Sequence, residues 1–124
     1  MINNDPPLNE LLLRKVKFAH IRPDKTILNE AFRPRKTDDS TTGLENNIST
    51  APKSCYNTED KLKTFLWERT AIYEIHSQYP DSISYLQCIE TNYCHVGICG
   101  DMRLLNNDDE TREFLAQNSL RHYP

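Results

Sequence analysis

The spacing of apolar residues changes its period at Pro80, and this change restricts the folds open to the chain. From residue 57 to 78, apolar residues recur at three- and four-residue intervals, which is typical of an amphipathic helix. After Pro80, residues 83–89 and 93–99 alternate between apolar and polar, which is typical of strands. The short polar break between these two runs predicts an antiparallel hairpin. We therefore expect one long helix packed on one face of a hairpin.

The remaining segments give weaker patterns. Asn107, Asp108 and Asp109 offer a cap for a final helix over about residues 110–120. Residues 8–21 suggest a short helical turn followed by a strand. The stretch 34–54 is polar and without periodicity, so we expect it to be a loop. Together these patterns predict an α+β fold with a small antiparallel sheet, one long helix, a C-terminal helix and an irregular N-terminal half, in a single domain over 1–124.

Charge and hydropathy exclude several classes of protein. The chain has 124 residues, with 15 Lys and Arg against 18 Asp and Glu, which gives a net charge of −3. A net negative chain is not expected to hold nucleic acid by general electrostatic attraction. Its apolar runs are too short to span a bilayer or to form the core of a signal peptide. We expect a cytoplasmic protein that does not bind membranes.

Glycine is scarce, and this argues against nucleotide-binding loops. The three glycines are Gly43, Gly97 and Gly100. A loop whose backbone approaches phosphates usually needs several glycines close together, and no Lys-Ser or Lys-Thr follows the Gly97–Gly100 pair. We therefore expect neither a P-loop nor a dinucleotide fingerprint, and no cofactor.

Four cysteines raise the question of a metal site or a disulfide. Cys88, Cys94 and Cys99 lie close to His95 in the sequence, and Cys55 lies apart from them. A structural zinc site usually has two close-spaced ligand pairs, and no C-x-x-C is present. On one strand, Cys94 and Cys99 would point to opposite faces. Disulfides also need an oxidising compartment. We expect no metal and no disulfide.

Several short blocks resemble a group of small uncharacterised bacterial proteins. The blocks are Phe-Ala-His-Ile-Arg-Pro at 18–23, Ala-Phe-Arg-Pro at 31–34, Asp38-Asp39, and Gly-Leu at 43–44. The group shares an I-x-P turn, an A-F-R-P block, an acidic residue, and later a histidine near a glycine, which would be His95 here. The chain departs from the group at 44–46, which is Leu-Glu-Asn in place of Leu-Ser-Val, so no role of that serine carries over. The resemblance implies membership of bacterial defence or conflict operons and brings no established activity.

The polar residues within these blocks are the candidate site. They are His20, Arg22, Arg33, Arg35, Asp38, Asp39 and His95. Arginine binds phosphate oxygens through two donors and histidine serves as a general acid or base, so this set suits chemistry on a nucleotide or nucleic acid. In an enzyme, His20, Arg33 and His95 would be catalytic and would converge on one cleft.

A structural role competes with each catalytic assignment. Arg33 can pair with Asp38 or Asp39 to close the start of the polar loop, and these residues together with Arg22 can form a binding surface instead of an active site. His95 within a strand can serve the sheet through a hydrogen bond. Two functions therefore remain. The sequence favours an interaction or regulatory module with a larger protein partner, because no complete catalytic set is present. The alternative is a small enzyme that acts on a nucleotide or nucleic acid.

Overall fold

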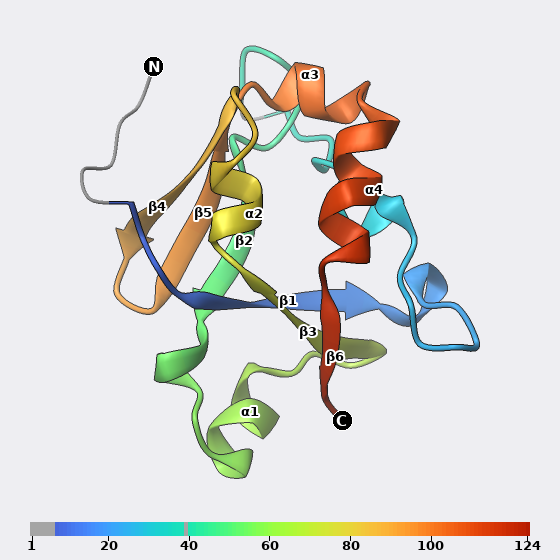
Figure 1. Cartoon of the computed structure of the whole chain (residues 1–124), viewed down its shortest axis with the longest axis vertical. Coiled ribbons are helices and arrows are strands. Elements are labelled where there is room, and N and C mark those ends of the chain that lie inside the picture. The colour runs from blue at the N-terminus through green and yellow to red at the C-terminus, as the bar shows by residue number, and fades with distance from the viewer. Residues whose placement is uncertain (1–6, 39) are drawn as a thin grey trace.

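The computed structural model describes residues 7–38 and 40–124, and its centre is a six-stranded antiparallel sheet (Figure 1). The strand order is β4-β5-β2-β1-β3-β6. The strands are β1 (Leu11–Lys17), β2 (Asn47–Pro52), β3 (Thr70–His76), β4 (Leu86–Asn92), β5 (His95–Gly100) and β6 (Leu120–Tyr123). The helices are α1 (Glu59–Phe65), α2 (Gln78–Asp81), α3 (Met102–Asn106) and α4 (Asp109–Gln117), with 3-10 turns η1 (Phe18–His20), η2 (Asn29–Phe32) and η3 (Lys53–Cys55).

The sheet has two halves that meet at β2. The first four residues of β2 pair with β5, whereas only its last two, Ala51 and Pro52, pair with β1. Beyond the pair Leu13↔Ala51, β1 pairs with β3 alone, and it does so along its whole length. The strands β1 and β2 therefore diverge after a short contact, and Figure 1 shows them spreading away from each other.

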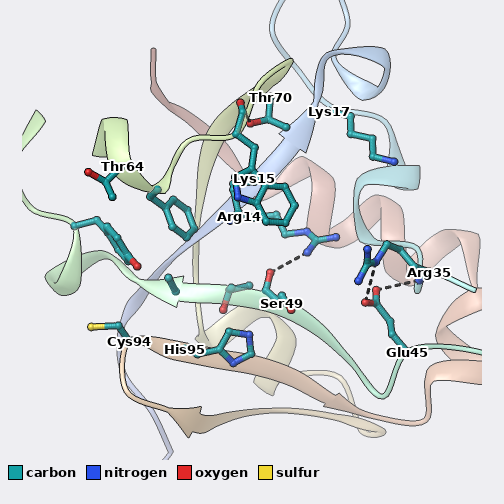
Figure 2. A pocket seen from close by; sticks show the side chains of 15 residues that line it. Arg14, Lys15, Lys17, Arg35, Glu45, Ser49, Thr64, Thr70, Cys94 and His95 are labelled. Carbon is teal, nitrogen blue, oxygen red and sulfur yellow. Dashed lines mark hydrogen bonds and ion pairs between the residues drawn. The ribbon is translucent and has the colours of Figure 1, made fainter. Parts of the chain in front are cut away.

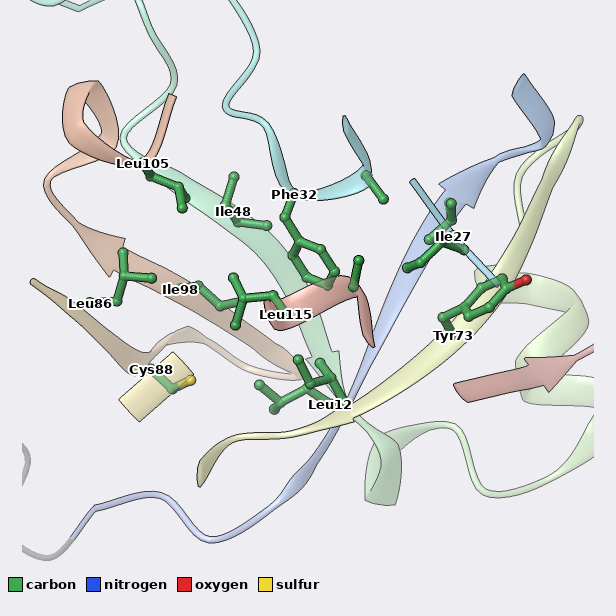
Figure 3. Close-up of a cluster of buried hydrophobic side chains, with 14 of the residues drawn as sticks. Leu12, Ile27, Phe32, Ile48, Tyr73, Leu86, Cys88, Ile98, Leu105 and Leu115 are labelled. Atoms are coloured by element: carbon green, nitrogen blue, oxygen red, sulfur yellow. The ribbon is translucent and has the colours of Figure 1, made fainter. Parts of the chain in front are cut away.

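The main core fills the face of the sheet that α4 and η2 cover. Alternation along β1 directs Leu12 and Val16 into this core. Phe32 from η2 and Leu115 from α4 meet them there, and both are fully buried (Figure 3). Leu13 points the other way, into a smaller cluster with residues of α1 and β3. The sheet is therefore covered by apolar side chains on both faces near β1.

A buried arginine fixes the turn between α3 and α4. The Arg112 side chain is fully buried, and its guanidinium donates to the carbonyls of Leu105 at 2.6 Å and Asn106 at 2.8 Å. It also pairs with the carboxylate of Asp109. A buried charge is tolerated where its hydrogen-bond donors have acceptors, and these bonds provide acceptors for the guanidinium.

The prediction of one long helix over residues 57–78 is wrong. The helical part is α1, which Thr58 caps by accepting a bond from the Lys61 amide at 3.2 Å and which stops at Phe65. Arg69 then takes a positive φ of 59°, and β3 begins at Thr70. The strand β3 lies between β1 and β6 and is buried on both faces, so it carries a nearly continuous apolar run instead of an alternation. That run happened to fit helical spacing.

The predicted fold class is also wrong, because the N-terminal half of the chain is not irregular. Both β1 and β2 belong to the sheet, and β2 occupies the end of the stretch expected to be a loop. The sheet is consequently larger than expected. The hairpin is present, because β4 pairs antiparallel with β5 around a turn at Tyr93 and Cys94. The C-terminal helix is present as α4, although β6 follows it.

Candidate binding pocket

A pocket of about 510 Å³ opens where β1 and β2 diverge. One side is formed by β1 beyond its contact with β2, and a second side by residues 49–51 of β2. Segments on either side of these strands complete it, from α1 and the turn before β3, and from the hairpin turn before β5. Figure 2 shows the side chains that line it. The pocket is therefore a direct consequence of the short β1–β2 ladder.

The lining of this pocket is rich in positive charge. Four cationic side chains face a single carboxylate, that of Glu45; the cations are Arg14, Lys15, Lys17 and Arg35. The whole chain has a net charge of −3. Positive charge is thus concentrated at this pocket, and a concave surface of one sign attracts ligands of the opposite sign.

Arg14 holds the diverging strands at a fixed separation. Its Nη1 donates to the Ser49 carbonyl at 2.8 Å (Figure 2). Its Nε and Nη2 donate to the Ala31 carbonyl at 3.1 and 3.0 Å. These acceptors are main-chain groups and carry no formal charge. Burial lowers the Arg14 pKa to about 10, so the guanidinium remains charged at neutral pH. Arg14 therefore gives the pocket a positive charge at a fixed position.

Lys15 packs against two aromatic rings on the α1 side. Its Nζ lies 3.6 Å from the centroid of the Trp67 ring and 4.3 Å from that of Phe65. Cation–π attraction favours this position. Burial, and secondarily the nearby Arg14, lowers the Lys15 pKa. Trp67 is 63% exposed at the rim of the pocket.

The two remaining cations differ in how they are engaged. Arg35 is 76% exposed and pairs with Glu45, with 3.2 Å from Nε to Oε2, while its backbone amide donates to Oε1 at 2.9 Å. Lys17 is exposed at the end of β1 and forms no ion pair with another described residue. The charge of Lys17 is therefore available to a ligand, whereas that of Arg35 is partly neutralised.

A disulfide between Cys55 and Cys94 lies at this pocket, and it overturns the expectation of four free thiols. The expectation of no disulfide depended on the predicted compartment and not on strand geometry. Cys94 belongs to the hairpin turn and has a positive φ of 57°. Cys55 follows β2 at the end of η3. Cys88 and Cys99 are not disulfide-bonded.

The proposed catalytic residues do not share one cleft. Of His20, Arg33 and His95, only His95 lines the pocket, where its Nδ1 hydrogen-bonds the hydroxyl of Thr91. His20 lies half-buried in η1, and burial, followed by the charge of Lys17, lowers its pKa. The arrangement lacks the convergence that the enzyme hypothesis required.

Arg33 has a structural role with a partner that the sequence did not indicate. Its Nε contacts Glu30 Oε2 at 2.7 Å, and its Nη1 donates to the carbonyl and the side-chain oxygen of Asn106 at 2.9 and 3.0 Å. The expected pairing with Asp38 is wrong, and Asp39 lies outside the described residues. The three-residue spacing between Glu30, which lies in η2, and Arg33, which follows its last residue, explains the difference, because it brings the two side chains onto one side of a turn.

The other residues of the expected binding set lie apart from the pocket. Arg22 closes its own turn by donating to the Ile27 carbonyl at 3.0 Å. Asp38 is exposed. Arg35, from the larger set of candidate polar residues, does line the pocket. The sequence therefore located two pocket residues, Arg35 and His95, and missed the cations of β1 and the aromatic rings around them.

Comparisons with protein-family models, with curated proteins and with solved structures gave no match. Within residues 7–38 and 40–124, no group of three or more His, Cys, Asp or Glu side chains is arranged to hold a metal ion. None of the helices formed by these residues combines the length and the apolar character that a membrane span requires.

Proposed function

We propose that this protein is an interaction module that binds an acidic segment of a larger protein partner in the pocket between β1 and β2. The charge of the pocket supports this most directly, since four cations face one carboxylate there. Carboxylates of a partner segment would be attracted to Lys17 and to the fixed charge of Arg14.

The aromatic lining favours a protein segment over a simple anion. Tyr56, Phe65 and Trp67 give the pocket apolar walls beside its cations. Aromatic side chains and arginine are the residues most enriched at the centres of protein interfaces. A segment with acidic and apolar side chains would engage both kinds of surface.

The alternative of an enzyme acting on a nucleotide or nucleic acid has less support. It relied on His20, Arg33 and His95 acting together, and Arg33 is engaged with Glu30 and Asn106 instead. The Arg14 guanidinium is likewise committed to main-chain carbonyls. These groups can hold structure and supply charge, but they form no paired acid and base.

We further propose that the module acts in the cytoplasm, with the resemblance to small bacterial proteins as support for a role in a defence or conflict operon. A disulfide in that compartment is usually transient or redox-sensing, since cellular thiols keep cysteines reduced. The Cys55–Cys94 bond is compatible with this location if it exchanges with such thiols.

The single tryptophan provides a test of the binding function. Trp67 lines the pocket, so its emission reports on occupancy without a label. Titration with a tetraglutamate peptide should give a saturable change in emission that weakens as salt is added. Tetralysine is the matched probe of opposite charge, and an equal response to both peptides would contradict the proposal.

Lysine variants assign the binding to this pocket. Lys17→Gln should weaken tetraglutamate binding about two- to fivefold, the range expected for one exposed charge. Lys61→Gln removes the same charge from an exposed position of α1 outside the pocket and is the control. If both variants weaken binding equally, the attraction is a property of the whole chain and the pocket is not the site.

A further inference from the structure

We propose that the Cys55–Cys94 disulfide is a redox switch for the pocket, so that reduction by a dithiol lowers its affinity for acidic segments. This inference rests on the proposed binding function, because it concerns the regulation of the same pocket. It begins from the position of the bond, which joins Cys55 on the α1 side to Cys94 on the hairpin side. Figure 2 shows the Cys94 side chain at the pocket.

The disulfide is the direct bond between these two sides. The α1 side carries Tyr56, Phe65 and Trp67, and the hairpin side carries His95. Within the part of the chain that the structure describes, no hydrogen bond or ion pair joins residues 53–69 to residues 91–95. When the disulfide opens, the two sides stay connected through the β2–β5 ladder, which reaches Thr50↔Val96, and by packing, but no bond joins them directly.

The hairpin turn can move without disturbing the sheet. Cys94 and its neighbour Tyr93 form the turn, and Tyr93 is 96% exposed, so little covers the turn from outside. The β4–β5 ladder runs from Leu86↔Gly100 to Asn92↔His95, with an irregularity between Glu90 and Asn92, so only Tyr93 and Cys94 lie outside it. Cys55 likewise lies after the last residue of β2, outside the ladders of that strand. Opening the bond therefore frees two segment ends and leaves the strand pairing intact.

Both cysteines are within reach of a small reductant, since each is only half-buried. A thiolate of the dithiol attacks one sulfur, the Cys55–Cys94 bond breaks, and a mixed disulfide forms. The second thiol of the reductant then attacks the mixed disulfide and releases the protein cysteine that is held in it. The products are two cysteine thiols and the oxidised, cyclic dithiol, so two electrons and two protons pass to the protein. A disulfide oxidant reverses the step.

Reduction affects binding through the population of the closed pocket. The segment that carries Tyr56 and Phe65 can then separate from the hairpin that carries His95. If the competent form falls to about one tenth of the molecules, the apparent affinity falls about tenfold. Arg14 stays in place, because its bonds to the Ser49 and Ala31 carbonyls involve neither the disulfide nor the α1 side. Reduced protein should therefore bind more weakly and still prefer acidic peptides.

The test compares oxidised and dithiothreitol-reduced protein. Tetraglutamate is titrated against Trp67 emission in each form, alkylation under denaturing conditions counts the thiols by mass, and far-UV circular dichroism reports the fold. We expect two thiols before reduction and four after it, an unchanged dichroism spectrum, and an affinity about tenfold lower that recovers on reoxidation. Cys99→Ser keeps the disulfide and should respond to dithiothreitol as the natural sequence does.

Three results would overturn the switch. They are an unchanged affinity after complete reduction, a global loss of structure on reduction, and a bond that dithiothreitol does not reduce in the folded protein. A separate measurement covers failure of the binding function itself. If oxidised protein does not bind tetraglutamate, acrylamide quenching of Trp67 without ligand still decides the matter, since an opened pocket exposes the ring more and an unaffected pocket does not.

Discussion

The guanidinium of Arg14 donates to the main-chain carbonyl of Ser49 across the gap where β1 and β2 cease to pair. Where the edge of a strand has no partner strand, its carbonyls need another hydrogen-bond donor. Here the Arg14 side chain is that donor. The same guanidinium satisfies the Ala31 carbonyl of η2. One residue therefore joins β1, β2 and η2 while the strands remain far enough apart to leave the pocket open.

Arg14→Lys is predicted to destabilise the protein although it keeps the charge. Lysine lacks the planar fork and cannot serve the Ser49 and Ala31 carbonyls together, so we expect a loss of about 2–4 kcal/mol in the free energy of unfolding. Urea denaturation measures this loss. Arg35→Lys is the matched control, because Arg35 is exposed and its replacement should cost less than about 1 kcal/mol. Equal losses in the two variants would contradict a bridging role for Arg14.

Removal of the disulfide is predicted to lower stability without changing the fold. The bond closes a loop between residues separated by 39 positions. Without it the unfolded chain gains conformational entropy, which lowers the free energy of unfolding by about 2–4 kcal/mol for a loop of this size. The double variant with Cys55→Ser and Cys94→Ser should therefore unfold at lower urea concentration and retain a native dichroism spectrum. The variant Cys99→Ser should keep a midpoint close to that of the natural sequence. An unfolded double variant would show that the sheet depends on the bond.

Two glycines with positive φ offer a sharp test of the packing. A Cβ added at Gly100, which has a φ of 136°, would lie 1.9 Å from the Tyr85 carbonyl oxygen. Since that neighbour is backbone and cannot rotate away, Gly100→Ala should cost more than about 3 kcal/mol. Gly43 also has a positive φ, of 75°, yet a Cβ there meets nothing within 4 Å. Gly43→Ala should cost only about 1 kcal/mol. Thermal melts of the two variants would reveal the difference, and similar melting temperatures would contradict the close approach at Gly100.

The elements that sequence predicted well are those whose signals are local. The β4–β5 hairpin needs only alternation on two neighbouring runs, and α4 begins where Asp108 accepts a bond from the Thr111 amide at 3.0 Å. The strand β3 was missed because burial on both faces removes the alternation that identifies a strand. Its real neighbours, β1 and β6, lie far away in the sequence.

The pocket could not be predicted because its residues come together only through the sheet. Lys15 and Lys17 were visible as basic residues in an alternating run, but nothing in the sequence linked them to Trp67 or to the hairpin turn. The pairing of Cys55 with Cys94 was hidden for the same reason. The expectation of no disulfide also depended on the predicted compartment, which carries no information on which residues lie side by side in the fold.

The ion pair between Arg33 and Glu30 is predicted to make stability depend on pH. The hydrogen bond from Arg33, with its charge, lowers the pKa of the Glu30 carboxyl below its ordinary value. The folded protein therefore binds fewer protons at this site than the unfolded chain, so the contribution is present above the ordinary glutamate pKa and is lost as pH falls through the lowered one. Urea unfolding of the natural sequence at pH 6 and at about pH 3 should show this loss.

Arg33→Ala should be less stable than the natural sequence at pH 6, and this difference in stability should narrow at the lower pH. Part of the gap should persist in acid, because the bonds from Arg33 to Asn106 do not depend on the carboxylate. A gap of the same size at both pH values would mean that Glu30 contributes nothing to the role of Arg33.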